Sequence, residues 1–187
     1  GDRGGGATSS TLRNCVLSDN RADSSGGGAS SSTLYNCTLT GNSGLYGGGA
    51  ARSTLYNSVV YHNRAPVGSN YYASEFNSSC TSPLPGAGVG NIASDPQLAS
   101  WTHLSANSPC VGAGSALYAS GLDIDGEPWS RPPCVGADQQ VPGGATGTLS
   151  VTLDADFTRM AVGFAARFEA RIEGQPTDHR WTFGDGT

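Results

Sequence analysis

A unit of 21 to 22 residues occurs three times in succession near the start of the chain, and no other feature constrains the fold as strongly. The copies are GGGATSSTLRNCVLSDN at 4–20, GGGASSSTLYNCTLTGN at 26–42 and GGGAARSTLYNSVVYHN at 47–63. They begin 22 and then 21 residues apart. A fixed period of this length is typical of solenoids, in which each repeat forms one coil that stacks on the next.

Each copy contains short runs of Thr, Leu, Val and Tyr that are interrupted by Gly and Asn, which favours strands and bends over helices. Parallel strands pair about 4.8 Å apart, so equivalent residues of successive coils lie directly above one another. The sequence therefore predicts an all-β parallel β-helix with an interior column of leucines and a column of stacked asparagine amides at a bend. These columns are Leu12, Leu34 and Leu55, and Asn14, Asn36 and Asn57.

Composition and charge exclude several classes of function. The net charge is −5 and the basic residues, all of them Arg, form no cluster, so nucleic acid is not an expected partner. The lack of Lys excludes Schiff-base chemistry. No apolar run approaches the ~18 residues that a membrane-spanning helix needs. The chain begins without Met and the repeat is already under way at Gly4, so we expect an internal piece of a longer protein.

The chain has five cysteines, and because this number is odd at least one of them is outside any intrachain disulfide. Cys15 and Cys37 share one column in adjacent coils, where parallel Cβ vectors give poor disulfide geometry, so we expect buried free thiols there. Of the remaining three, Cys80 and Cys110 are predicted to form a disulfide, although Cys134 leaves other pairings open.

The order of features in the repeat resembles that of right-handed parallel β-helix proteins, the pectin-lyase-like superfamily in the broad sense. Residues 67–77 are expected to form a further, irregular turn. Four later segments follow in an order similar to the C-terminal end of bacterial choice-of-anchor Q proteins: NIASDPQL at 91–98, SPCVGAG at 108–114, DIDGEP at 123–128 and GAD at 136–138. The resemblance implies a secreted or cell-surface protein whose irregular C-terminal cap covers the last coil. We therefore assign residues 1–140 to the β-helix turns and their cap.

A different pattern follows a Gly/Pro/Thr-rich linker at 141–148. Apolar residues alternate at 149–157 and 163–172, which predicts strands, and WTFGDG at 181–186 resembles the signature of PKD domains. These domains are immunoglobulin-like β-sandwiches of secreted and surface proteins. The resemblance implies that residues 149–187 are a partial PKD-like sandwich, which cannot bury its own core.

Few residues are candidates for chemistry. Glycoside hydrolysis needs two carboxylates at a defined separation, but Asp19 and Asp23 are the only acidic residues between positions 4 and 65. We therefore assign no catalytic residue and lean toward a protein that is not an enzyme. His62 is a candidate base or, more simply, a solvated bend residue.

Two sets of residues are candidates for binding. The aromatic candidates for stacking on sugar rings are Tyr35, Tyr56 and Tyr61, although tyrosine is equally common on any strand face. Asp123 and Asp125 are spaced as in a Ca²⁺ loop, although Glu127 and Pro128 break the EF-hand pattern and favour a plain turn. No cofactor is expected apart from that Ca²⁺ alternative.

The favoured interpretation is a secreted or surface-displayed, non-catalytic β-helix segment that acts as a stalk, an adhesin or a building block of an extracellular assembly. The expected partners are a polysaccharide, a cell-surface glycan or further copies of the chain. One alternative is an accessory, carbohydrate-binding part of a polysaccharide-active lyase or hydrolase. Another is a self-assembling filament subunit, in which a neighbouring chain completes the sandwich by strand addition.

Overall fold

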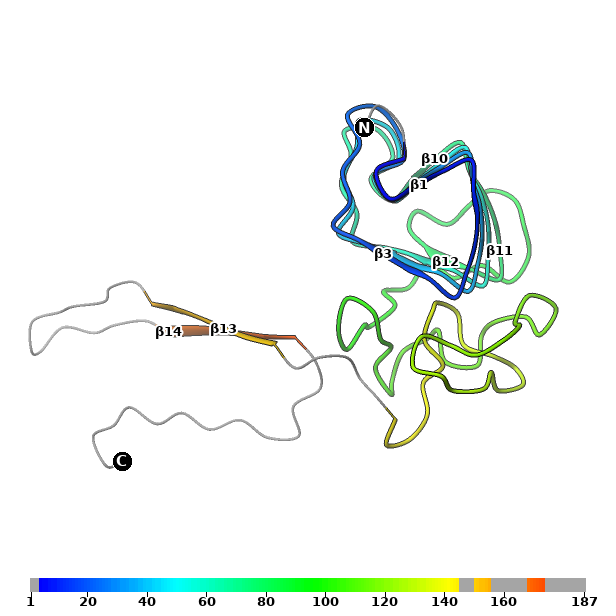
Figure 1. Cartoon of the computed structure of the whole chain (residues 1–187), viewed down its shortest axis with the longest axis vertical. Helices are drawn as coiled ribbons and strands as arrows, with labels where there is room; N and C mark the ends of the chain where they lie inside the picture. The colour runs from blue at the N-terminus through cyan, green and yellow to red at the C-terminus, as the bar shows by residue number, and fades with distance from the viewer. Residues whose placement is uncertain (1–3, 145–149, 156–167, 174–187) are drawn as a thin grey trace, which may run out of the picture.

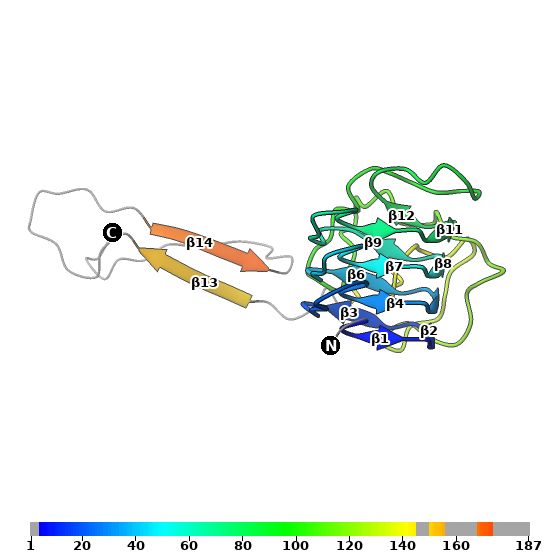
Figure 2. The same ribbon diagram turned by 90° about the horizontal axis from the view of Figure 1, so that it is seen from above.

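The structure is a computed structural model that describes residues 4–144, 150–155 and 168–173. Its main feature is a parallel β-solenoid of about four turns, which confirms the predicted parallel β-helix architecture (Figures 1 and 2). Each turn carries three short strands separated by bends. The strands of the four turns, in order, are β1 (Ala7–Thr8), β2 (Thr11–Arg13) and β3 (Val16–Ser18); β4 (Ala29–Ser30), β5 (Thr33–Tyr35) and β6 (Thr38–Thr40); β7 (Ala50–Ala51), β8 (Thr54–Tyr56) and β9 (Val59–Val60); and β10 (Tyr71–Tyr72), β11 (Glu75–Asn77) and β12 (Cys80–Thr81).

Equivalent strands of the four turns form three parallel sheets, with the orders β1-β4-β7-β10, β2-β5-β8-β11 and β3-β6-β9-β12. The register pairs Leu12 with Leu34, Leu34 with Leu55 and Leu55 with Phe76. Leu34 and Leu55 are fully buried, whereas Leu12 on the first turn is partly buried. The fourth turn, at residues 67–81, carries Phe76 in the leucine column, so one larger ring continues the apolar interior.

The Gly-Gly-Gly that opens each repeat allows the coils to approach closely at one corner. Gly26 has a φ of 69°, in the left-handed region that glycine adopts without strain. A Cβ on Gly27 would lie 2.4 Å from the carbonyl oxygens of both Gly48 and Ser43. Glycine is therefore required at Gly27 by the close packing of backbone against backbone.

The end of the fourth turn is covered by the chain that follows it. Ser78 N donates to Val89 O at 2.8 Å and Thr81 N donates to Ile92 O at 2.9 Å, and Cys80 forms a parallel bridge with Ile92. These contacts satisfy backbone groups that an open sheet edge would leave unpaired.

Residues 95–144, here called the lateral lobe, pack along the side of the solenoid instead of over its end (Figure 1). Val59 and Cys80 point outward from the sheet β3-β6-β9-β12 and are buried against Leu104, Cys110 and Val135 of the lobe. The C-terminal region was expected to cap the last coil. Most of it instead covers one side of the solenoid. The physical reason is that this sheet has an apolar outer face, which must be covered as well.

The remaining described residues form a two-stranded antiparallel hairpin of β13 (Ser150–Ala155) and β14 (Phe168–Glu173). Its register pairs Val151 with Ile172. The expected PKD-like sandwich rests mainly on residues outside the described ones, including the motif at 181–186. Among the residues that the structure describes, no helix is long and apolar enough to cross a membrane.

Candidate functional site

An open groove follows the bends that join the third strand of each turn to the next turn. Its volume is about 630 Å³. Arg21 forms a bridge with Ser43, and Ser43 forms a bridge with Arg64, so these residues occupy one column on three consecutive turns. The lining residues are Arg21, Ala22, Asp23, Ser43, Gly44, Leu45, Arg64, Ala65, Pro66 and Ser69.

A column of asparagines, buried at Asn42 and Asn63, lies directly before the groove and fixes its backbone. Asn42 N and Nδ2 both donate to Asn63 Oδ1, at 2.9 and 3.0 Å, and Asn20 repeats this pattern onto Asn42. Asn42 Nδ2 also donates to Leu17 O at 2.8 Å. Because each amide is bound to the turn beside it, the residues after the column are held in register.

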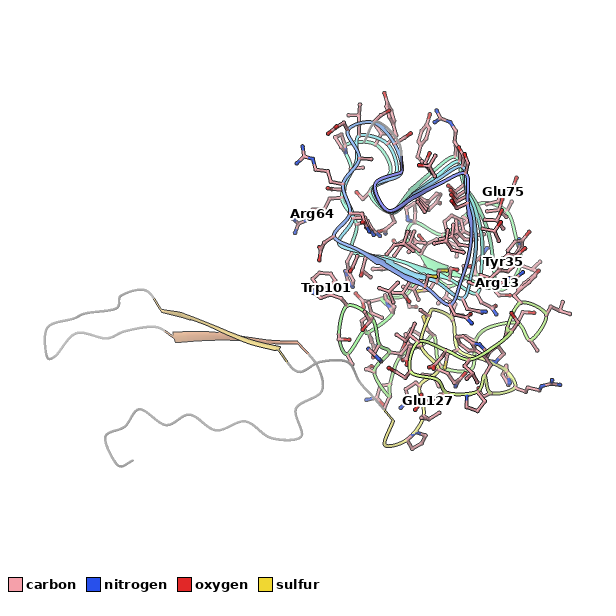
Figure 3. All side chains as sticks on the ribbon, in the orientation of Figure 1. Arg13, Tyr35, Arg64, Glu75, Trp101 and Glu127 are labelled. Atoms are coloured by element: carbon pink, nitrogen blue, oxygen red, sulfur yellow. The ribbon has the colours of Figure 1, made fainter. Side chains whose placement is uncertain are left out.

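The two arginines of the groove are available to bind an anion. Within the described part of the chain, neither Arg21 nor Arg64 forms a salt bridge. They lie two turns apart, which corresponds to about 9.6 Å at the usual strand spacing. A guanidinium group binds a carboxylate through two parallel hydrogen bonds, so a repeating acidic chain is a chemically suitable ligand. Figure 3 shows Arg64 projecting outward, on the side of the molecule where Trp101 also lies.

A second hollow, of about 400 Å³, lies between the third turn and the lateral lobe. Nε2 of His62 lies 3.7 Å from Oδ2 of Asp95, and Trp101 lines the same hollow with 39% of its surface exposed. An indole face can stack on a sugar ring, and a histidine beside a carboxylate can exchange a proton. The repeat contains His62 but not its partner, so the pair could not be predicted from the repeat pattern.

The predicted sugar-stacking tyrosines do not gather at either hollow. Tyr35 and Tyr56 stack on one another with ring centroids 5.0 Å apart, and Tyr118 of the lateral lobe lies 4.5 Å from Tyr56. The guanidinium of Arg13 lies 3.9 Å from the ring centre of Tyr35. Burial, followed by the neighbouring Tyr35 and Tyr118, raises the pKa of Tyr56. Much of the surface of these rings therefore contacts protein.

Tyr61, the third predicted tyrosine, lies apart from this stack. Its ring packs edge-on against His62, and its hydroxyl donates to Ala93 O at 3.3 Å. Stacking of these three tyrosines on sugars remains a prediction.

Asp123 and Asp125, the predicted Ca²⁺ ligands, lie in one turn of the lateral lobe but have different contacts. Asp123 Oδ1 accepts hydrogen bonds from the backbone amides of Asp125 and Glu127, at 2.9 and 2.8 Å, and its Oδ2 accepts one from Gln139 N. Asp125 Oδ2 lies 2.7 Å from Nε2 of His103. Asp123 thus shapes the turn, while Asp125 faces His103, which comes from a different loop of the lobe.

Two acidic groups beside this turn have shifted pKa values. Burial, together with the nearby Asp123 and Asp125, raises the pKa of Asp138 to about 6. Burial and the same two carboxylates also raise the pKa of Glu127. Asp138 could not be assigned to this cluster from the sequence, because only the fold of the lobe brings 136–138 beside 123–127.

The cysteines form two neighbouring pairs of free thiols. Cys80 and Cys110 are buried, and a hydrogen bond between their side chains, followed by burial, raises the pKa of Cys80. The predicted bridge between them stays a prediction, although the structure brings the two thiols together. Cys37 is buried and Cys15, on the first turn, is partly exposed.

Comparison of the chain with protein-family models, with curated proteins and with solved structures returned no match.

Proposed function

We propose that this chain is a non-catalytic, extracellular β-helix segment that binds an acidic polysaccharide along the Arg21–Arg64 groove, as part of a surface stalk, an adhesin or an extracellular assembly. The observation that carries the proposal is the column Arg21–Ser43–Arg64, which offers two guanidinium groups without salt bridges among the described residues. A solenoid repeats its surface at a fixed interval, and a polysaccharide repeats its charge at a fixed interval. Repeated, weak contacts of this kind suit adhesion.

Secretion and surface display are supported by resemblance. The repeat is similar to that of the right-handed, pectin-lyase-like β-helix proteins. The later segments resemble the end of choice-of-anchor Q proteins, and WTFGDG at 181–186 resembles the PKD signature. Each of these likenesses points to the cell surface as the place where a glycan ligand would be met.

The test measures binding of the chain to acidic and neutral polysaccharides by isothermal titration calorimetry, with polygalacturonate and alginate against dextran. The double variant Arg21→Gln/Arg64→Gln should lower the affinity for the acidic polymers at least about tenfold, because each charged hydrogen bond contributes about 1.5–3 kcal/mol. Binding should also weaken as salt is raised. Arg52→Gln, which changes an exposed arginine on another bend, is the matched control.

Equal binding of dextran and polygalacturonate, or unchanged affinity in the double variant, would contradict the proposal. An equal loss of affinity in Arg52→Gln would also contradict the proposal, because binding would then depend on the net charge of the chain and not on the position of the arginines in the groove.

A second candidate function rests on the pair His62–Asp95 in the hollow beside Trp101. A catalytic part of a polysaccharide-active enzyme would need such a proton-exchanging pair, whereas an accessory part that binds carbohydrate would need only the aromatic platform. If the chain shortens polygalacturonate or alginate and Asp95→Asn abolishes that activity, the enzymatic alternative replaces the non-catalytic one. The filament alternative concerns residues that lie largely outside the described ones.

A further inference from the structure

Three segments of the lateral lobe meet at one point. His103 comes from the loop after Trp101, Asp125 and Glu127 come from one turn, and Asp138 comes from the segment that packs on the solenoid. One ligand atom from each of His103, Asp125 and Asp138 lies within 4.8 Å of the others. The carboxylates of Asp123, Asp125, Glu127 and Asp138 form an overlapping group within the same limit. Figure 3 shows Glu127 in this lobe, away from the solenoid.

Asp138 has a carboxylate oxygen that the protein leaves without a hydrogen bond. The residue is 1% exposed, and its Oδ2 accepts a hydrogen bond from Leu104 N at 2.8 Å. Its Oδ1 is buried and has no hydrogen-bond partner among the described residues. A buried, unpaired carboxylate oxygen is costly, and it becomes favourable when it binds a cation.

His103 is held in the manner of a metal-binding histidine. Its Nδ1 contacts the hydroxyl groups of Thr102 and Ser100, the latter at 3.2 Å, and this fixes the orientation of the ring. The other ring nitrogen, Nε2, faces Asp125 at 2.7 Å. Metal-ligating histidines usually have the second nitrogen fixed by a hydrogen bond in this way.

We propose that this cluster binds one divalent cation, through Nε2 of His103 and the carboxylates of Asp125 and Asp138, with Glu127 of the overlapping carboxylate group beside them. An imidazole combined with carboxylates suits Zn²⁺ or Mn²⁺, whereas Ca²⁺ prefers oxygen ligands alone. Ligand atoms around one tetrahedral Zn²⁺ lie about 3.3–3.6 Å apart, given bonds of about 2.0–2.2 Å. The atoms of His103, Asp125 and Asp138 lie within 4.8 Å of one another, so they need to approach by no more than about 1.5 Å, while Nε2 of His103 and Oδ2 of Asp125, now 2.7 Å apart, need to separate slightly. Asp123, already bonded to three backbone amides, supports the turn.

The bound ion would connect three loops that have no regular secondary structure between them. It would therefore stabilise the lateral lobe against the outer face of the sheet β3-β6-β9-β12. This role is independent of the Arg21–Arg64 groove.

The test is a titration of the whole, EDTA-treated chain with ZnCl₂, MnCl₂ and CaCl₂, measured by calorimetry and by native mass spectrometry. Mn²⁺ is included because thiolates bind it poorly, so the free cysteines cannot imitate the site. The main variants are Asp125→Asn, whose side chain is partly exposed, and His103→Gln. Asp19→Asn, an acidic residue of a solenoid bend, is the control, and circular dichroism verifies that every variant is folded.

We expect one Mn²⁺ or Zn²⁺ per chain, a rise in melting temperature on binding, and at least a tenfold loss of affinity in Asp125→Asn and His103→Gln but not in Asp19→Asn. The proposal is overturned if the wild-type chain binds none of the three ions, or if both folded variants retain wild-type affinity. Tighter binding of Ca²⁺ than of Zn²⁺ and Mn²⁺, unchanged in His103→Gln, would also overturn it.

Discussion

Nδ2 of Asn57 donates one hydrogen bond to Oδ1 of Asn36, 3.0 Å away on the preceding turn, and another to the carbonyl oxygen of Ser115, 2.8 Å away in the lateral lobe. Asn36 Nδ2 does the same with Asn14 and Tyr118, at 3.2 and 3.0 Å. The asparagine column therefore joins successive turns to one another and also joins the solenoid to the lobe. Both functions need an amide, which donates and accepts at the same time.

Asn57→Ala should destabilise the protein by about 3–5 kcal/mol. The substitution removes hydrogen bonds worth about 1 kcal/mol each and leaves their buried partners unsatisfied. It also places alanine at a φ of 47°, in the left-handed region that asparagine tolerates better because its side chain can form local hydrogen bonds. Urea denaturation measures the effect. Asn57→Gly is the matched control, because it relieves the backbone strain and should recover about 1 kcal/mol. If alanine and glycine were both neutral, the column would not support the fold.

Gly27→Ala should be among the most damaging single changes, at about 3 kcal/mol or more, because the new Cβ would overlap two backbone carbonyl oxygens at 2.4 Å. Backbone groups on neighbouring turns cannot move without breaking the ladder. A Cβ on Gly86 would have nothing within 4 Å, so Gly86→Ala should change stability by no more than about 0.5 kcal/mol. Thermal melts of the two variants provide the comparison, and similar melting temperatures would contradict the packing argument.

Cys15 should be the most reactive thiol near neutral pH. A hydrogen bond from the Cys37 side chain lowers the pKa of Cys15 to about 6, so its reactive thiolate is present above that pH and is lost as the pH falls through it. The rate of alkylation by iodoacetamide, followed by peptide mass spectrometry, should be half-maximal near pH 6 and level off about one pH unit higher. Cys37→Ala removes the donor and should move the midpoint upward toward about 8.5. An unchanged midpoint would show that Cys37 does not control this thiol.

Mild oxidation should join Cys80 to Cys110 and leave Cys134 reduced. The first two thiols are hydrogen-bonded to one another in the buried cluster under the lateral lobe. Non-reducing peptide mapping identifies the bridge, and Cys134→Ser is the control that should leave it intact. A bridge from Cys134 to either partner would refute the predicted pairing.

Residues inside the repeats could be placed from the sequence, whereas residues outside the repeats could not. Arg21 and Arg64 stand at matching places of two repeats, so their shared column was implicit in the period, although no sequence pattern predicted that a groove would open there. His103, Asp125 and Asp138 belong to no repeat, and their convergence depends on the path of three irregular loops. Such paths are set by packing against Val59 and Cys80, and no local pattern encodes that packing.

The sequence by itself determined the coil, its register and its interior column, because a period of 21 to 22 residues brings identical side chains into contact with one another. Only the tertiary structure decided that residues 95–144 lie beside the solenoid and that an imidazole and several carboxylates meet within them. The physical reason is range: stacking repeats interact with their nearest neighbours in the chain, whereas the lateral lobe is placed by burial of an apolar sheet face that distant residues must cover.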